Sequence, residues 1–78
     1  PIDHYRINKF CGSIAMNESI ESVRSRALEH PGFRITGNYE REGTYSFIIH
    51  CPWSFGRFTC FIENDGKAVT KATFNDSD

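Results

Sequence analysis

Residues 33–51, with the sequence FRITGNYEREGTYSFIIHC, decide the fold of this chain. On both sides of the central Arg-Glu-Gly at 41–43, apolar and polar side chains alternate with a period of two, which is typical of a half-buried strand. A three-residue hairpin turn needs its last residue in the left-handed region, and Gly43 occupies that position. The stretch therefore predicts a β-hairpin with strands over 33–40 and 44–51.

The same turn sets the register of this predicted hairpin. It places Tyr39 opposite Tyr45 and Ile35 opposite Ile49, so that these apolar pairs share one face of the sheet. A slip of one residue would separate the members of each pair, because neighbouring strand residues point to opposite faces. We therefore expect the face that carries these pairs to be the buried one.

A second hairpin is predicted around the Asn-Asp-Gly sequence at 64–66. A two-residue Asp-Gly turn and a three-residue turn both fit this sequence, and they give different partners across the strands. The three-residue turn pairs Glu63 with Lys67 and Phe61 with Val69, which matches opposite charges and apolar side chains. We therefore expect the three-residue turn.

The clearest helical periodicity lies before the first hairpin. Apolar side chains recur there at the i, i+4, i+7 and i+11 positions that line one face of a helix, namely Met16, Ile20, Val23 and Ala27, with Leu28 beside them. Asn17 is suited to cap the N-terminus, because its side-chain oxygen can accept a hydrogen bond from a free backbone N–H group. Pro31 and Gly32 are typical of a helix end. The pattern predicts one helix over about 17–30.

Together these segments predict an α+β fold in two layers. One α-helix over about 17–30 packs on a four-stranded antiparallel β-meander with strands at about 33–40, 44–51, 57–63 and 67–74. Tyr5 and Ile7 alternate among polar neighbours, which leaves an additional N-terminal strand over 3–10 as an open alternative. The expected core lies between the helix and the inner face of the sheet, which carries Ile35, Phe47, Ile49, Phe58, Cys60, Ile62 and Phe74.

Length and composition limit the classes of protein to which the chain can belong. Its 78 residues suit a single small domain over 1–78, and a content of 38% hydrophobic and 24% charged residues is typical of a folded globular chain. The net charge of −1 argues against a general polyanion binder. No apolar run approaches the roughly 20 residues that span a bilayer, and no signal-peptide pattern stands at the N-terminus. We therefore expect a cytoplasmic protein without a membrane partner.

The three cysteines, Cys11, Cys51 and Cys60, are too few for the disulfide framework of a secreted miniprotein. We expect them to act as small buried hydrophobic side chains. A Cys51–Cys60 disulfide would fit two adjacent strands, but a cytoplasmic location disfavours it. His50 directly precedes Cys51, yet neighbouring strand residues point to opposite faces, so we do not expect the two to form a Cys–His nucleophile.

The sequence contains no motif that indicates a metal ion or a cofactor. Tetrahedral zinc sites usually draw on close pairs of the Cys-x-x-Cys or His-x-x-x-His type, and neither pair occurs. A glycine-rich phosphate loop is also missing. Glu40 and Glu42 flank a predicted exposed turn, where nothing would perturb the pKa of a carboxyl group. We therefore expect no catalytic residues, no metal and no cofactor, and a function other than catalysis.

The outer face of the predicted sheet is too apolar for a surface that meets only solvent. Exposed aromatic side chains near an arginine are typical of interface hot spots. The residues expected to bind a partner lie on this face and in the loop 52–56, and they are Trp53, Phe55, Ile48, His50, Phe61, Arg57 and Arg34. Three alternatives stay open, namely that residues 3–10 cover the face, that a second copy of the chain covers it, and that Trp53 folds back onto the core.

We therefore predict a non-enzymatic, small protein-binding module that docks a protein partner through the outer sheet face and the aromatic loop 52–56. Small size and the lack of a catalytic constellation fit an accessory or inhibitor protein of phage or mobile-element origin. A homodimer also fits, because so short a chain has a thin margin of stability. The alternative function is binding of single-stranded nucleic acid by the outer-face aromatics, which the even mixture of charges makes the less favoured one.

Overall fold

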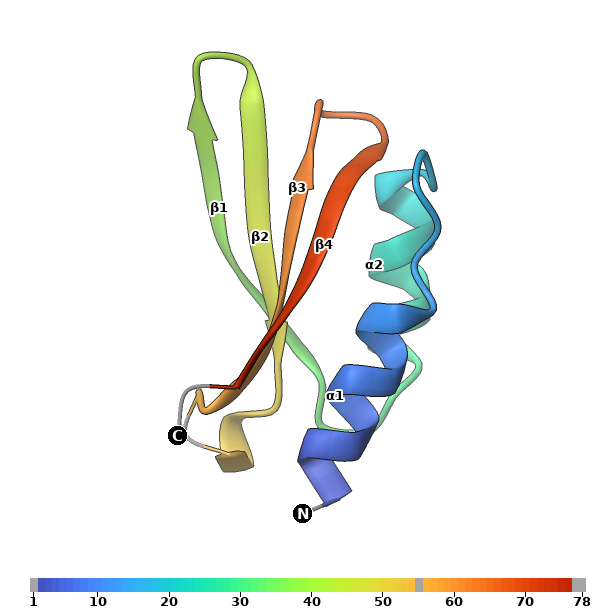
Figure 1. Cartoon of the computed structure of the whole chain (residues 1–78), viewed down its shortest axis with the longest axis vertical. Coiled ribbons are helices and arrows are strands. Elements are labelled where there is room, and N and C mark those ends of the chain that lie inside the picture. The colour runs from blue at the N-terminus through green and yellow to red at the C-terminus, as the bar shows by residue number, and fades with distance from the viewer. Residues whose placement is uncertain (1, 55, 77–78) are drawn as a thin grey trace.

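The chain forms a four-stranded antiparallel sheet with two helices packed on one of its faces (Figure 1). The computed structural model describes residues 2–54 and 56–76. The strands follow one another across the sheet in chain order, as β1 (Arg34–Arg41), β2 (Thr44–His50), β3 (Phe58–Asn64) and β4 (Val69–Asp76). The predicted α+β meander is therefore confirmed.

The helical layer contains two helices instead of the one that was predicted, α1 (Ile2–Gly12) and α2 (Ile20–Leu28). Helix α1 lies against β3 and β4, and α2 contacts β1. A short 3-10 helix, η1 (Pro52–Ser54), connects β2 to β3. Both long helices lie on the same side of the sheet in Figure 1, so the opposite face of the sheet has no helix on it among the described residues.

The N-terminal segment is a helix, and the alternative of a strand over 3–10 is wrong. The buried side chains of α1 are Ile7, Phe10 and Cys11, which have the i, i+3, i+4 spacing of one helix face. Tyr5, which suggested a period of two together with Ile7, is 61% exposed. Two apolar residues are too few to distinguish the period of two of a strand from the 3.6-residue period of a helix. Packing against β3 and β4 stabilises the helical form.

Helix α2 begins later than predicted because Ser19, and not Asn17, caps it. The Ser19 Oγ atom accepts a hydrogen bond of 3.1 Å from the backbone N–H of Ser22. Asn17 instead adopts a left-handed φ of 69° in the loop between the helices. Its backbone N–H donates to the carbonyl of Val69, which ties this loop to the start of β4.

Only the middle of the predicted helical stripe is buried. Val23 and Ala27 are fully inaccessible, and Ile20 packs against the edge of the core. Met16 and Leu28, at the two ends of the stripe, are each 64% exposed. The periodicity therefore identified the buried face of α2 and overestimated its length.

The β1–β2 hairpin has a tighter turn than predicted. Glu42 and Gly43 form a two-residue turn with φ values of 52° and 83°, and the two positive values are those of a type I′ turn. Gly43 is left-handed as expected, but Arg41 pairs with Thr44, and Tyr39 pairs with Ser46 instead of Tyr45. The predicted Tyr39–Tyr45 pair is therefore wrong.

A β-bulge between Thr36 and Tyr39 brings the rest of this hairpin back to the predicted register. Gly37 lies in the bulge with a φ of 73°, a conformation that glycine adopts without steric cost. Beyond it, Ile35 pairs with Ile49, as predicted. Because the bulge adds a residue to β1, Tyr39 turns to the face of the sheet opposite to Ile35.

The β3–β4 turn is longer than either of the two turns considered from the sequence, and the predicted pairing of Phe61 with Val69 is wrong. Asp65 organises the turn, since one of its carboxylate oxygens accepts hydrogen bonds of 2.8 Å from the backbone N–H groups of Lys67 and Ala68. These hydrogen bonds lower the pKa of the Asp65 carboxyl group. Val69 then pairs with Asn64 and is buried in the core, with 1% of its surface exposed.

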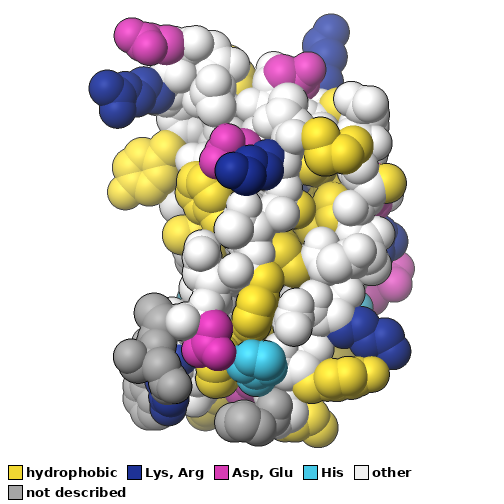
Figure 2. All heavy atoms as spheres, in the orientation of Figure 1, with side chains coloured by type: hydrophobic (Ala, Val, Ile, Leu, Met, Phe, Trp, Pro, Cys, Tyr) yellow, Lys and Arg dark blue, Asp and Glu magenta, His cyan; other side chains and the backbone are white. Residues whose placement is uncertain are grey.

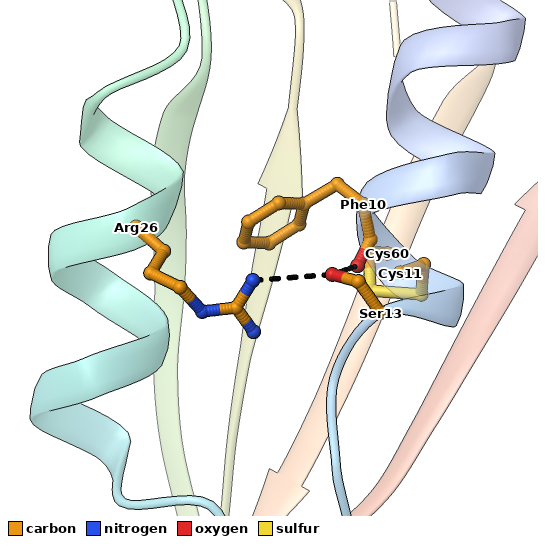
Figure 3. Close-up of a disulfide and its surroundings, with 5 residues drawn as sticks. All are labelled: Phe10, Cys11, Ser13, Arg26 and Cys60. Atoms are coloured by element: carbon orange, nitrogen blue, oxygen red, sulfur yellow. Dashed lines mark hydrogen bonds between the residues drawn. A yellow bond between two sulfur atoms is a disulfide. The ribbon is translucent and has the colours of Figure 1, made fainter.

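A disulfide joins Cys11 of α1 to Cys60 of β3, with Cα atoms 5.6 Å apart (Figure 3). All three cysteines are buried, as expected, but Cys11 and Cys60 are not free, and the alternative of a Cys51–Cys60 bridge is wrong. The pairing depends on α1 lying on the inner face of the sheet, which the sequence pattern did not predict. Cys51 is the remaining free cysteine; it is fully buried, and burial raises the pKa of its thiol.

The core lies between the helices and the inner face of the sheet. Every residue expected on that inner face is buried or packs against the buried cluster, and these residues are Ile35, Phe47, Ile49, Phe58, Cys60, Ile62 and Phe74. Helices α1 and α2 complete the cluster from the other side with Ile7, Phe10, Cys11, Val23 and Ala27. The residues of the inner face were therefore predicted correctly, but only one of the two helices that cover it was predicted.

Candidate functional site

The face of the sheet that lies away from α1 and α2 is called the open face here. Its residues alternate along each strand with the buried ones, and the pairing between strands places them side by side. The open face consists of Arg34, Thr36, Tyr39, Arg41, Thr44, Ser46, Ile48, His50, Thr59, Phe61, Glu63, Lys71, Thr73 and Asn75. Four of the seven residues predicted to bind a partner are among them, namely Ile48, His50, Phe61 and Arg34.

The apolar part of the open face is a central strip of Tyr39, Ile48 and Phe61. Ile48 and Phe61 are direct partners on β2 and β3, and both are partly buried. Tyr39 is 72% exposed. A Cβ atom placed on Gly37 would lie 3.6 Å from the ring of Tyr39 and 4.0 Å from Cδ1 of Ile48. The tyrosine ring therefore covers the glycine in the bulge and reaches toward Ile48.

Tyr39 is the residue of this strip that the sequence reasoning missed. The predicted register placed it on the inner face, opposite Tyr45. A glycine inside a strand pattern often marks a bulge, so Gly37 was the signal that could have placed Tyr39 correctly. The bulge enlarges the aromatic surface of the open face by one ring.

A depression of about 490 Å³ lies where the open face approaches the tip of the β1–β2 hairpin. Its walls combine aromatic, hydroxyl and charged side chains, and they are formed by Tyr39, Arg41, Glu42, Thr44, Ser46, Phe61 and Glu63. In the orientation of Figure 2, charged side chains surround the tip of this hairpin at the upper left, and hydrophobic side chains follow directly below it. The depression therefore joins the central strip to a polar rim.

Basic side chains outnumber acidic ones on the open face. Arg34, Arg41 and Lys71 lie on it, against Glu63 as its acidic residue. Glu63 and Lys71 occupy paired positions on β3 and β4. The chain as a whole has a net charge of −1, so the open face has the opposite sign to the molecule.

Arg34 and His50 occupy the end of the open face nearest to the loop 52–56. They are direct partners on β1 and β2, and the Arg34 Nη1 atom donates a hydrogen bond of 3.0 Å to the carbonyl of Phe33. Arg34 is exposed and His50 is partly buried. Cys51, the next residue, is buried on the other side, which confirms that His50 and Cys51 lie on opposite faces.

The loop 52–56 presents its tryptophan to solvent. Trp53 is 80% exposed, so the alternative in which it folds back onto the core is wrong. Its ring lies beside Gly32 in the α2–β1 loop, 3.7 Å from where a Cβ atom of that glycine would be. Trp53 therefore lies beside the α2–β1 loop and is not part of the central strip. Phe55 lies outside the described residues.

Arg57, the last of the predicted partner-binding residues, precedes β3. It is exposed, and its guanidinium carbon lies 5.6 Å from the ring centroid of Phe58. Phe58 belongs to the inner face of the sheet. Arg57 therefore packs against the edge of the core, while Ile48 and Phe61 lie on the other side of the sheet.

Neither a cluster of metal-ligating side chains nor a membrane-spanning helix occurs in the part of the chain that the structure describes. No three His, Cys, Asp or Glu side chains within residues 2–54 and 56–76 are grouped so that they could hold a metal ion. None of the described helices has the length and apolar character needed to cross a membrane. The thiol of Cys51 is buried, and its raised pKa keeps it protonated at neutral pH.

Comparison with known proteins gave no relative of this chain. No family model, no curated protein and no solved structure matches it.

Proposed function

We propose that this protein is a non-enzymatic binding module that docks a protein partner on the open face of its sheet. This proposal is based on the observation that helices cover one face of the sheet and leave the other face open. Both helices pack on one face, while the other presents the central strip of Tyr39, Ile48 and Phe61 beside a depression of about 490 Å³. An aromatic and aliphatic centre with a polar rim is the usual anatomy of a protein interface.

The partner that suits this surface has an acidic patch around an apolar centre. Arg34, Arg41 and Lys71 surround the strip, and charge complementarity at the rim of an interface speeds association and selects partners. Tyrosine and arginine are among the residue types that most often carry the binding energy of an interface. We expect Tyr39 to contribute most, because its ring is exposed and is held against the backbone at Gly37.

Binding of single-stranded nucleic acid is the second candidate function, and the charge of the open face favours it. Two rings, those of Tyr39 and Phe61, lie on an open sheet together with Arg34, Arg41 and Lys71. Stacking of bases on such rings and attraction of phosphates to such cations are how single-strand binders work. Partial burial of Phe61 and the carboxylate of Glu63 place this function second.

The cellular location and the biological role stay predictions. A cytoplasmic location was expected because the sequence has no membrane-spanning apolar run and no signal-peptide pattern, but the Cys11–Cys60 disulfide favours an oxidising compartment. The role of an accessory or inhibitor protein of phage or mobile-element origin is supported only by the small size of the domain. A homodimer formed through the open face would use the same central strip, and its test is the molecular mass in solution.

The decisive experiment compares Tyr39→Ala with Tyr45→Ala. Both substitutions remove a tyrosine ring from the same hairpin, but Tyr45 is on the inner side, near Gly66. Partners are captured by crosslinking of the purified chain in cell extract and identified by mass spectrometry, and the affinity of the captured protein is then measured. We expect Tyr39→Ala to weaken binding about tenfold or more and Tyr45→Ala to leave it unchanged.

Three outcomes would contradict the proposal. Equal loss of binding in the two variants would remove the open face from the interface. Saturable binding of a labelled single-stranded oligonucleotide that weakens steeply with salt, in a chain that captures no protein, would support the second candidate instead. A concentration-dependent dimer that Tyr39→Ala dissociates would show that the partner is a second copy.

A further inference from the structure

A groove of about 330 Å³ lies between α1 and α2, on the other side of the molecule from the open face. Helix α1 contributes Tyr5, Arg6 and Lys9 to its walls, and the end of α2 contributes Arg26, followed by His30. Its volume is at the lower end of the range for small-ligand pockets. None of its described lining residues is an Asp or a Glu. The groove therefore has basic walls without an acidic residue among them.

The floor of the groove is aromatic and rigid. Phe10 is 4% exposed, and its ring makes a T-shaped contact with the ring of His30, with ring centroids 5.3 Å apart. The guanidinium carbon of Arg26 lies 5.2 Å from the centroid of the same ring, and Figure 3 shows this side chain extending from α2 alongside the ring. The Cys11–Cys60 disulfide anchors the residue next to Phe10 to the sheet. The cation and the ring are therefore held in a fixed arrangement.

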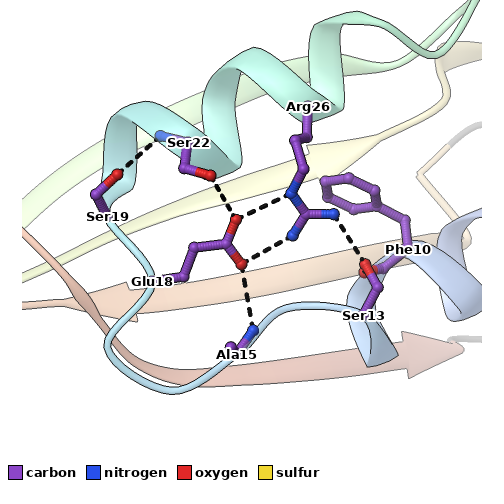
Figure 4. Close-up of polar contacts among 7 residues, drawn as sticks. All are labelled: Phe10, Ser13, Ala15, Glu18, Ser19, Ser22 and Arg26. Atoms are coloured by element: carbon purple, nitrogen blue, oxygen red, sulfur yellow. Dashed lines mark hydrogen bonds and ion pairs between the residues drawn. The ribbon is translucent and has the colours of Figure 1, made fainter.

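Glu18 fixes Arg26 from outside the groove. Its carboxylate accepts hydrogen bonds of 2.9 Å from Nε and 2.8 Å from Nη2 of Arg26, as Figure 4 shows. These bonds lower the pKa of Glu18 to about 2. The remaining Nη1 atom turns toward Ser13, a lining residue, and donates to its Oγ atom at 3.2 Å. A guanidinium group has five N–H donors, so two of those of Arg26 have no acceptor among the described residues and are available to a ligand.

Lys9 is the cation of the groove that lacks an acidic partner among the described residues. Its Nζ atom lies 3.2 Å from the hydroxyl oxygen of Tyr5 and 5.4 Å from the centroid of that ring. Arg6 is partly engaged, since one Nη atom lies 3.8 Å from a carboxylate oxygen of Asp3 and the other donates to the carbonyl of Pro31. An ammonium group has three donors, so Lys9 also keeps donors for a ligand. Figure 2 shows basic side chains next to hydrophobic ones at the lower right, where α1 lies.

We propose that this groove binds an organic oxyanion, of the aryl phosphate or aryl sulfate class. The oxyanion accepts hydrogen bonds from Lys9 and Arg26, which are charge-assisted and therefore strong. The flat apolar part of the ligand lies against the ring of Tyr5, which is 61% exposed. The site is separate from the open face, so a protein partner and this ligand can bind at the same time.

The experiment follows backbone amide signals of the ¹⁵N-labelled, oxidised chain by NMR during titration with phenyl phosphate. Inorganic phosphate and phenol are titrated separately, so that the charge and the ring are tested one at a time. The variant is Lys9→Gln, and the control is Lys67→Gln, which removes the same charge from an exposed position in the β3–β4 turn. Neither side chain belongs to the core, so both variants are expected to fold.

We expect phenyl phosphate to shift signals of α1 and of the C-terminal half of α2 in a saturable manner. Lys9→Gln should weaken this binding about tenfold, as loss of one charge-assisted hydrogen bond does, and Lys67→Gln should leave it unchanged. Inorganic phosphate should bind about tenfold more weakly than the aryl ester. The proposal is overturned by the absence of saturable shifts, by equal binding of Lys9→Gln and the unsubstituted chain, or by inorganic phosphate binding as tightly as phenyl phosphate.

Discussion

Removal of the Cys11–Cys60 disulfide is expected to cost between about a third and all of the stability of this protein. The two cysteines are 49 residues apart in the sequence, and the chain-entropy relation for a loop of that length gives about 4 kcal/mol of stabilisation. A chain of 78 residues has a free energy of unfolding of about 4 to 12 kcal/mol. The double variant Cys11→Ala/Cys60→Ala should therefore be marginally folded or unfolded at about 37 °C.

The assay is urea unfolding followed by far-UV circular dichroism, with a thermal melt as the second measurement. A loss of about 4 kcal/mol corresponds to a decrease in Tm of roughly 15 to 30 °C for a domain of this size. Addition of a reductant should lower the Tm of the unsubstituted chain by a similar amount and leave that of the double variant unchanged. Cys51→Ala is the matched control, because it removes a buried sulfur without opening a loop and should cost only about 1 kcal/mol. A loss below about 1 kcal/mol in the double variant would refute the reasoning.

Three further substitutions test the local structure, each by the free energy of unfolding in urea. The pKa of the Glu18 carboxyl group is lowered to about 2, so its ionised form should contribute about 1 to 2 kcal/mol to the free energy of unfolding at pH 7. This contribution should disappear as the pH falls from about 5 to 2, and the stability difference between the unsubstituted chain and Glu18→Gln should shrink with it. An equal difference at pH 7 and pH 3 would contradict this. Gly37→Ala should cost about 1 to 2 kcal/mol, because a φ of 73° is strained for any residue with a Cβ atom. Gly12→Ala, at a position with no left-handed φ and with nothing within 4 Å of the added carbon, should not destabilise the chain. Ser19→Ala should cost about 1 kcal/mol through loss of the helix cap, and an unchanged value would show that Ser19 does not hold the start of α2.

Local patterns were sufficient to predict the four strands and the inner face of the sheet, but not the register near its turns. Alternation with a period of two placed Phe47, Ile49, Cys60 and Ile62 on the inner face, and all four are buried. The same alternation placed Ile48 and Phe61 together on the opposite face, where they are direct partners. Such predictions succeed because the direction of a strand side chain depends only on its position relative to its neighbours. The centre of the open face was therefore recognisable from the alternation of side chains alone.

The features that sequence reasoning missed depend on residues far apart in the chain or on backbone irregularity. Helix α1 gains its stability from packing against β3 and β4, and its apolar spacing is short. The partner of Cys60 could not be found without α1, since Cys11 comes from that helix. The bulge at Gly37 shifted Tyr39 by a single position, which was enough to move it to the other face.

The basic groove was missed for a related reason. Arg6 and Lys9 come from one helix, and Arg26 and His30 lie at the end of another. A prediction with a strand over 3–10 and a single helix has no surface on which these four side chains meet. Arg6 and Lys9 are three residues apart, which places them on the same face only if the segment is a helix.

The burial of Cys51 has a consequence for how the chain matures. Cys51 lies between the two disulfide-bonded cysteines in the sequence, and it is much closer to Cys60 along the chain than Cys11 is. In the complete unfolded chain the shorter loop closes more readily, so a mispaired Cys51–Cys60 species should accumulate early and require thiol–disulfide exchange to reach the native pairing. Sequestration of the Cys51 thiol in the finished core then prevents the reverse exchange. Oxidative refolding of Cys51→Ala, followed by chromatography under non-reducing conditions, should proceed without that early species.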